Sequence, residues 1–359
     1  MRLDVDFVQG ADILAPGLSR AQRPLIEGMA QDERFRLRPI TFPSNAGSML
    51  FPYAYGPLAA RLWASQAPLV HIANSWYGHL VPLIRRPSIV NCHDLIELEE
   101  METGERPMKP HRRFHLRAAM HGMGQATFIA CDSEATARKV RERLPQSAKR
   151  VRVVPCGVSP IFSPGNADPA VLRRLQARPP YVLFVGSEQP RKNLPRLVAA
   201  VAAVRESVPE LKFVKVGGHQ TAAGRDALER ACEVGGLDGA TTVLEGVADA
   251  DLLHLYRGAA VTALPSLREG FGYPPLEAMA CGCPAVVSDR DSLPEVVGSA
   301  ASIVDPLDVG AIAEGLRRAI KDGDERRRLQ LEGPEQAAQF SWGCVAEGYR
   351  ALYEEALQR

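Results

Sequence analysis

The stretch that decides the fold is LPSLREGFGYPPLEAMACGCPAVVSD, residues 264–289. It starts where one apolar run, 259–264, ends, and it contains a second, 285–288, and each run predicts a buried strand. Between the runs, a glycine turn leads into two prolines, which suit the first turn of a helix because their missing N–H groups have no partner there. This order of strand, turn, helix and strand predicts a parallel βαβ unit.

The same alternation of short apolar runs and helical periodicity continues along the chain. We predict strands at 3–8, 69–73, 88–92, 126–130, 151–154, 181–185, 212–216, 241–244, 259–264, 285–288 and 301–304. Helical periodicity occupies many of the gaps, for example 135–143, 194–207, 225–232, 308–320 and 344–357. Near-continuous apolar strands that alternate with helices are typical of doubly wound α/β architecture with parallel sheets.

A proline-rich stretch interrupts this alternation near the middle of the 359 residues. Its prolines are Pro160, Pro164, Pro169, Pro179 and Pro180. Such density predicts a stiff, extended linker, and the length of the chain suits two domains. We therefore predict an N-terminal domain over 1–160, a linker over 161–180 and a C-terminal domain over 181–340. The aromatic helix predicted at 341–359 is expected to pack back on the N-terminal domain.

Composition excludes several classes of protein. Hydrophobic residues make up 46% and charged residues 24%, with a net charge of +1, which argues against a disordered chain and against nucleic acid as a partner. The sequence has no apolar run of the roughly 18 residues that a membrane-spanning helix needs, and its start lacks the pattern of a signal peptide. Seven cysteines without a CxxC pair suggest a reduced, cytoplasmic protein without a zinc site. The basic stretch 109–121 is expected to be a solvated helix, with contact at the inner face of a membrane as the alternative.

Two carboxylates flank the glycine turn of residues 270–272. Glu269 follows the first strand, and Glu277, eight residues later, is expected in the first turn of the helix. The N–H groups of a helix N-terminus favour a phosphate, and a nearby carboxylate can accept hydrogen bonds from ribose hydroxyls. The alternative is an ordinary βαβ turn with a capping acid.

A second polar segment, GSEQPRKN, occupies residues 186–193 directly after the strand predicted at 181–185. Gly186 opens the turn, and Arg191 and Lys192 precede Asn193, which is predicted to cap the next helix. Two cations at a helix N-terminus suit a diphosphate, because Arg can bind two oxygens at once and Lys adds a point charge. The alternative is a pair of solvated charges beside a helix cap.

Together the two segments resemble the nucleotide-sugar site of retaining glycosyltransferases of family 4. The first has the form EGFG-x-P-x-x-E-A-M-A-x-G-x-P-x-V, which matches that family's E-x7-E signature, and the second matches its G-x-x-x-x-R-K-N segment. The resemblance implies the GT-B fold, in which two Rossmann-like domains face each other across a cleft. It also implies that Arg191 and Lys192 hold the donor's diphosphate, that Glu277 binds the ribose and that Glu269 faces the sugar ring.

The N-terminal half carries a looser likeness to the same family. His93 and Asp94 follow the strand predicted at 88–92, and the resemblance implies that His93 lies beside the transferred sugar. The alternatives are a core histidine and a loop cap. Gly17 matches the family's glycine loop, and Val247 is a candidate for a backbone contact to the nucleotide base. The donor-binding candidates are Gly17, Gly186, Arg191, Lys192, Val247, Glu269, Gly270, Phe271, Gly272 and Glu277.

The resemblance implies a hexosyltransferase that uses GDP-mannose or a UDP-hexose and retains the anomeric configuration. Its catalytic candidates are Glu269, Arg191, Lys192 and His93, and it needs no metal or other cofactor, since the two cations neutralise the leaving diphosphate. The acceptor would be a sugar, a lipid-linked sugar or a small molecule, in polysaccharide, glycolipid or small-glycoside biosynthesis. The alternatives are an epimerase or phosphorylase of the same fold and a non-catalytic partner that binds a nucleotide sugar.

Overall fold

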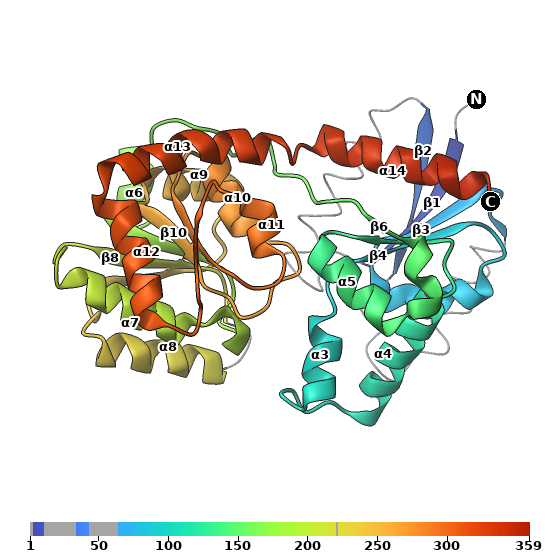
Figure 1. The fold of residues 1–359 in the computed structure, drawn as a ribbon, viewed down its shortest axis with the longest axis horizontal. Coiled ribbons are helices and arrows are strands. Elements are labelled where there is room, and N and C mark those ends of the chain that lie inside the picture. Colours follow the sequence, from blue (N-terminus) through green and yellow to red (C-terminus); the bar gives the residue numbers. More distant parts are fainter. Residues whose placement is uncertain (1–2, 11–33, 43–63, 220–221) are drawn as a thin grey trace. The chain divides into compact units, whose positions relative to one another are not determined.

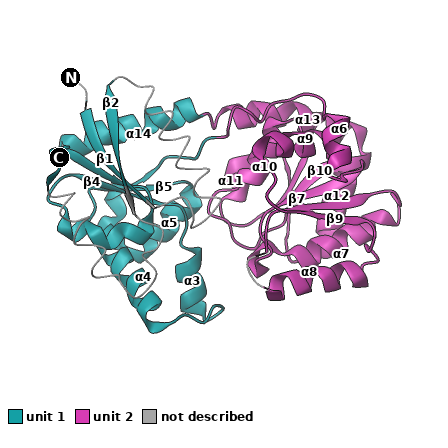
Figure 2. Cartoon of the chain, turned by 180° about the vertical axis from the view of Figure 1, so that it is seen from behind, with its two compact units in different colours: residues 1–157, 342–359 teal, residues 158–341 magenta. Residues whose placement is uncertain are grey.

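The computed structural model describes residues 3–10, 34–42, 64–219 and 222–359. The chain divides into two compact units, shown in different colours in Figure 2. Unit 1 comprises residues 1–157 and 342–359, and unit 2 comprises residues 158–341. The stretch 161–180, which we expected to be a linker, belongs to unit 2 and contains helix α6 (Pro169–Arg174). Asp168 starts this helix by accepting a hydrogen bond from the N–H of Ala170.

In the described part of unit 1, six parallel strands form one sheet in the order β2-β1-β3-β4-β5-β6. The strands are β1 (Leu3–Gly10), β2 (Phe35–Phe42), β3 (Leu69–Ile72), β4 (Ser88–Cys92), β5 (Phe128–Cys131) and β6 (Val151–Val153). The helical segments between them are η1 (Ser75–Leu83), α3 (Ile96–Thr103), α4 (Pro110–Met123), α5 (Glu134–Arg143) and η2 (Pro145–Arg150). This is the doubly wound α/β architecture that the alternating pattern predicts.

Strand β2 was not predicted. Its sequence, FRLRPITF, mixes cations and a proline with apolar residues, so it does not resemble a strand that is buried on both faces. The structure places it at the edge of the sheet, where Pro39 pairs in register with Phe7 of β1. An edge strand tolerates proline, because only one side of the strand has a neighbour that needs the backbone N–H.

Successive residues of the central strands of unit 1 enter two different hydrophobic clusters. In β5, Ile129 and Cys131 belong to one cluster, whereas Phe128 and Ala130 belong to the other. The first cluster includes residues of η1, α3, α4 and α5, and the second includes residues of the C-terminal helix α14 (Trp342–Leu357). Each face of the sheet is therefore covered by its own layer.

The C-terminal helix α14 is bound to unit 1 by polar contacts as well as apolar ones. The hydroxyl of Tyr353 lies 2.6 Å from Nδ1 of His71, and Nε2 of His71 lies 2.9 Å from Oδ1 of Asn91. Asn91 in turn donates a 2.6 Å hydrogen bond to the hydroxyl of Tyr349. Burial lowers the pKa of His71 to about 4, so the ring is neutral, with Nδ1 accepting from Tyr353 and Nε2 donating to Asn91.

In unit 2, over residues 158–219 and 222–341, six parallel strands form a sheet in the order β12-β11-β10-β7-β8-β9. The strands are β7 (Tyr181–Val185), β8 (Lys212–Val216), β9 (Thr241–Leu244), β10 (Val261–Leu264), β11 (Ala285–Ser288) and β12 (Ser302–Val304). These agree with the predicted strands to within two residues at each end. Strands β7, β10 and β11 are buried along their whole length, as expected for strands covered on both faces.

The helices of unit 2 form two layers (Figure 1). One layer contains α7 (Leu194–Arg205), α8 (Ala222–Val234) and α12 (Val309–Lys321), in which α7 packs against both of the others. The other contains α9 (Asp249–Gly258), α10 (Tyr273–Ala280), α11 (Leu293–Val297) and α13 (Gly323–Ala338), in which α10 contacts the other three. Across the described ranges, we find no helix that is both long enough and apolar enough to cross a membrane.

Candidate active site

The strand order of unit 2 reverses between the neighbouring strands β7 and β10. From β7 the chain continues to β8 and β9 on one side, and then returns to β10 on the other side. In open α/β sheets, ligands bind at the carboxyl ends of the strands where the strand order reverses in this way. The two polar segments singled out from the sequence, 186–193 and 265–277, begin at the carboxyl ends of these two strands.

The turns after β7 and β8 approach each other so closely that only glycine fits. A Cβ atom on Gly217 would lie 2.5 Å from the carbonyl oxygen of Gly186, and Gly217 has φ +122°. Gly186 also has positive φ, and its N–H donates to the carbonyl of Val216. The predicted site residue Gly186 therefore begins a turn whose backbone is fixed by the neighbouring strand.

The short helix η3 (Pro190–Lys192) brings the two predicted cations to the carboxylate after β10. Lys192 Nζ lies 2.6 Å from Oε1 of Glu269, and Nη1 of Arg191 lies 3.3 Å from Oε2 of the same side chain. Arg191 is further fixed by hydrogen bonds to Gln189 Oε1 and to the carbonyl of Arg268. The structure therefore joins three of the four predicted catalytic residues in one cluster.

The cluster is buried and strongly charged. The side chain of Glu269 is 9% exposed and that of Lys192 is 10% exposed. Burial alone would raise the pKa of Glu269, but the charges of Lys192 and Arg191 outweigh burial and hold the pKa of this carboxyl below its usual value. The lowered pKa favours the ionised form of this carboxyl, and two basic side chains face it.

Asn193 has a different role from the predicted one. It occupies the position before α7 with φ +61°, but its side chain makes no capping hydrogen bond to this helix in the described structure. Its amide nitrogen instead donates to the carbonyls of Pro265, 3.0 Å away, and Pro306, 2.7 Å away. Asn193 thus ties the end of η3 to the loops that follow β10 and β12.

The glycine turn after β10 is held by Asp291 and Ser292. The N–H of Glu269 donates to Oδ2 of Asp291, and the hydroxyl of Ser292 contacts the carbonyl oxygens of Glu269 and Phe271 at 3.2 Å and 2.7 Å. Gly272 has φ +119°, and a Cβ atom there would lie 2.7 Å from Leu293. The candidates Gly270, Phe271 and Gly272 therefore form a rigid turn that leads into α10.

Glu277 lies in the second turn of α10 and not in the first, because the helix begins at Tyr273. We predicted Glu277 in the first turn of the helix, where the backbone N–H groups have no partner within the helix. That prediction was wrong by one turn. The side chain is buried, and its Oε2 accepts a 2.8 Å hydrogen bond from the hydroxyl of Tyr256 on α9. Sequence reasoning did not find Tyr256, because a tyrosine in an amphipathic helix is indistinguishable from a core residue.

Sequence reasoning also missed a buried ion pair behind the turn after β7. Lys215 of β8 and Glu188 have no exposed side-chain surface, and Nζ lies 2.5 Å from Oε1. Arg225 of α8 adds hydrogen bonds of 3.0 Å and 2.9 Å to the two carboxylate oxygens. Burial opposes ionisation of Glu188, but the hydrogen bonds from Arg225 and Lys215 lower its pKa. The pair fastens the turn that carries Arg191 and Lys192 to β8 and α8.

His93 belongs to unit 1, at the carboxyl end of β4. Its Nδ1 donates to Oδ2 of Asp132 at 2.7 Å, and its Nε2 donates to the carbonyl of Ala73 at 2.9 Å. Burial would lower the pKa of His93, but the carboxylate of Asp132 raises it to about 9, so the ring is an imidazolium. A hydrogen bond from either nitrogen to a sugar hydroxyl would have to compete with these contacts. Asp94, two residues before the start of α3, accepts a 3.0 Å hydrogen bond from the N–H of Ile96.

Two further candidates were predicted from weaker signals. Val247 is half-buried in the loop after β9, which the structure places two strands away from β7. Gly17 and its loop, residues 16–20, lie outside the described residues.

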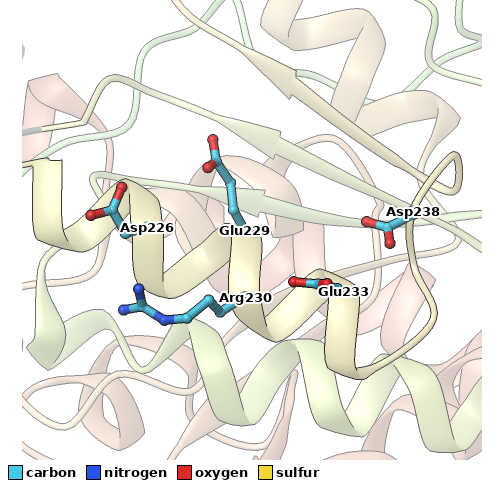
Figure 3. A pocket seen from close by; sticks show the side chains of 5 residues that line it. All are labelled: Asp226, Glu229, Arg230, Glu233 and Asp238. Carbon is cyan, nitrogen blue, oxygen red and sulfur yellow. The ribbon is translucent and has the colours of Figure 1, made fainter.

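A surface hollow on α8 has the wrong charge for an anionic ligand. Figure 3 shows its lining side chains, which are Asp226, Glu229, Arg230, Glu233 and Asp238. Four carboxylates and one guanidinium repel a diphosphate, so this hollow does not compete with the cluster at β7 and β10.

Comparison with known proteins agrees with this architecture. A family model described as "Glycosyltransferase Family 4" matches residues 11–162, and one described as "Glycosyl transferases group 1" matches residues 173–336. Sucrose-phosphate synthase from Thermosynechococcus elongatus has a similar structure, with TM-score 0.82 and 23% identity over 99% of both chains. An Anabaena protein, Alr3699/HepE, solved in complex with UDP-glucose, has TM-score 0.78 and 17% identity over 98% of this chain and 100% of its own.

Among curated proteins, the O-antigen chain mannosyltransferase B of Escherichia coli is 36% identical over 190 residues, which is 53% of this chain and 50% of that protein. The chain spans about half or less of the length of the curated relatives that match it first. The fold is GT-B, as the sequence resemblance implied. The two family models match adjoining parts of the chain, and the chain belongs to glycosyltransferase family 4.

Proposed function

We propose that this chain transfers a hexose from a nucleotide diphosphate sugar to an acceptor hydroxyl. One observation carries the proposal: Arg191 and Lys192 converge with Glu269 where the strand order of unit 2 reverses. Support also comes from outside the chain, since one relative is named a mannosyltransferase and one structural neighbour was solved with UDP-glucose. GDP-mannose and UDP-hexoses are therefore the donors to test first.

Arg191 and Lys192 bind the donor's diphosphate in this proposal. A guanidinium presents five N–H donors and an ammonium three, so both can keep their contacts with Glu269 and still donate to phosphate oxygens. As the bond between sugar and phosphate breaks, negative charge grows on the diphosphate. Cations that are already fixed in place stabilise this charge without having to reorganise.

The remaining candidates complete the donor site. Glu277 accepts hydrogen bonds from the ribose hydroxyls, and Glu269 faces the sugar ring. Gly186, Gly270 and Gly272 allow the donor to approach the backbone. Phe271 packs edge-on against the rings of Tyr273 and Phe340. We also propose that Gly17 and Val247 contact the donor through their backbone atoms, and that His93 lies beside the sugar.

We propose that the reaction retains the configuration at the anomeric carbon and needs no metal. The acceptor hydroxyl attacks from the face that the diphosphate leaves, and the departing phosphate takes the acceptor's proton. Because Arg191 and Lys192 neutralise the diphosphate, activity should be the same in EDTA. Loss of activity in EDTA with recovery in Mg²⁺ would refute this part of the proposal.

The function is tested in two stages. Thermal-shift measurements with GDP-mannose, UDP-glucose, UDP-GlcNAc and ADP-glucose identify the donor as the compound that raises the unfolding temperature. The purified protein is then incubated with that donor and simple sugar acceptors, and the product is examined by NMR. A new glycoside with the donor's anomeric configuration supports the proposal. An inverted coupling contradicts retention, and stabilisation by none of the four donors contradicts nucleotide-sugar binding.

A further inference from the structure

Tyr256 connects helix α9 to the carboxylate to which we assign the ribose. Its side chain is fully buried, and its hydroxyl lies 2.8 Å from Oε2 of Glu277. Glu277 is itself buried on α10, and the two helices are in contact. The pair therefore meets inside the layer of helices on one face of the sheet.

Packing alone does not account for the hydroxyl group of Tyr256. A buried hydroxyl costs free energy unless it has a hydrogen-bond partner, so phenylalanine would fill the same space without that requirement. The ring itself is held by apolar contact, since Phe162 packs against it edge-on, with 5.7 Å between the ring centres and 84° between their planes. The hydroxyl therefore serves the carboxylate of Glu277.

A glutamate carboxylate needs such a contact to point in one direction. The last torsion angle of a glutamate side chain has a broad distribution, so a carboxylate that no hydrogen bond fixes samples many orientations. When one oxygen accepts from a rigid donor, the direction of the other is fixed as well. A ligand hydroxyl then finds the acceptor already in place and does not have to order it on binding.

We propose that Tyr256 is a positioning residue for ribose recognition, which acts by fixing the carboxylate of Glu277. The proposal rests on the proposed function, because it assumes that Glu277 accepts hydrogen bonds from a ribose. It adds a residue that does not touch the donor and that determines how strongly the ribose hydroxyls contribute to binding.

Tyr181 supplies a matched control. It is also a fully buried tyrosine of unit 2, and its hydroxyl donates a 2.6 Å hydrogen bond to the carbonyl of Leu255 on the same helix, α9. Tyr181→Phe thus removes a buried hydroxyl that contacts α9, without removing a contact to Glu277. Tyr256→Phe removes a buried hydroxyl on α9 that donates to the carboxylate of Glu277.

The experiment measures dissociation constants by calorimetry for wild type, Tyr256→Phe and Tyr181→Phe. The ligands are GDP and UDP and the 2′,3′-dideoxy form of each. Tyr256→Phe should weaken binding of the ribonucleotide about tenfold, on the scale of one hydrogen bond to a charged group, and should change binding of the dideoxy form less than twofold. Tyr181→Phe should give the same ratio of ribo to dideoxy affinity as wild type.

Equal weakening of both forms by Tyr256→Phe would show a merely structural role and overturn the inference. So would unchanged ribonucleotide affinity, or a loss of the same selectivity in Tyr181→Phe. These outcomes differ from a failure of the proposed function, in which none of the four nucleotide sugars of the thermal-shift screen stabilises the wild-type protein. Wild-type binding that does not distinguish ribo from dideoxy forms would refute the assignment of Glu277 to the ribose, and with it the inference.

Discussion

The ammonium group of Lys192 lies 2.6 Å from Oε1 of Glu269, although 77 positions in the sequence separate the two residues. Lys192 follows β7 and Glu269 follows β10. Their contact therefore joins the segments that follow these two neighbouring strands, between which the strand order reverses. The carboxylate also binds Arg191 and therefore keeps both cations aligned. A diphosphate that binds here meets two fixed cations and one neutralising anion.

Removal of either cation should slow the reaction far more than it destabilises the protein. Arg191→Ala or Lys192→Ala should reduce turnover by about 100-fold or more, because each cation stabilises charge that develops as the donor's bond breaks. Initial rates at saturating donor check this. Lys212→Ala is the control and should retain the wild-type rate, because Lys212 starts β8 and so lies at the amino ends of the parallel strands, away from the site. Near-normal rates in the two site variants would refute the assigned role.

Neutralisation of Glu269 should have opposite effects on binding and turnover. In Glu269→Gln, the cations lose their bound anion, and a nucleoside diphosphate no longer approaches a negative carboxylate. We expect GDP or UDP to bind about fivefold more tightly, and turnover to fall at least tenfold because the sugar ring loses its carboxylate. Calorimetry and initial rates measure the two effects. Weaker binding of the nucleoside diphosphate would contradict the compensating role of Glu269.

The ion pair of His93 and Asp132 should make unit 1 less stable at alkaline pH. The pKa of His93 is raised to about 9 in the folded chain and is near 6.5 when unfolded, so between these values the folded state binds more protons. Its contribution is complete below pH 6.5 and is lost as pH rises through 9. We expect a loss of about 2 kcal/mol between pH 6.5 and 8.5.

Tryptophan fluorescence during urea unfolding measures this change in unit 1, because Trp76 and Trp342, the tryptophans among the described residues, belong to that unit. His93→Gln should flatten the dependence on pH between 6.5 and 9. The same slope in both proteins would show that His93 is not the titrating group.

His71 should make unit 1 less stable at acid pH, whereas His93 makes it less stable at alkaline pH. Its pKa is lowered to about 4 in the folded chain, so between pH 6.5 and 4 the unfolded state binds more protons and stability falls as pH falls. Between pH 7 and 5 we expect a loss of about 2 kcal/mol. The same fluorescence assay applies, and His71→Gln, though less stable throughout, should show a smaller loss over this interval. An unchanged loss would mean that other groups cause it.

The buried pair of Lys215 and Glu188 should be costly to break. Lys215→Met leaves Glu188 buried beside Arg225 alone, and removal of one partner from a buried pair typically costs about 3–5 kcal/mol. Hydrogen exchange of the amides in β7 and β8 should become faster by a corresponding amount. Arg174→Ala, which breaks the exposed contact to Asp251, is the control and should leave this exchange unchanged. Equal hydrogen-exchange rates in Lys215→Met and wild type would contradict the proposal that this ion pair anchors the turn after β7.

Much of the fold could be predicted because burial on both faces leaves a clear record in sequence. Strands such as β7 and β10 are nearly continuous apolar runs, with glycine after the first and proline after the second. The edge strand β2 leaves no such record, since among the described residues only one of its sides has a neighbouring strand and its sequence is partly polar. Its prediction would have required knowledge of the sheet order.

The candidate site could be predicted as a list of residues but not as a network. Arg191, Lys192 and Glu269 stand in segments whose glycines and prolines mark a turn at the end of a strand. The position of Glu277 was wrong by one turn, because helix starts are the least certain part of such predictions. Lys215 gave a signal that could have been used: a charge in a strand expected to be buried on both faces needs a partner. That the partner is Glu188 follows only from the folded chain.

The most direct test of the whole account is a crystal structure of the chain with the donor that the thermal-shift screen selects. The account predicts that the diphosphate lies within hydrogen-bond distance of Arg191 and Lys192 and that a ribose hydroxyl lies within hydrogen-bond distance of Glu277. A donor bound elsewhere, with these three side chains making no contact to it, would contradict the account.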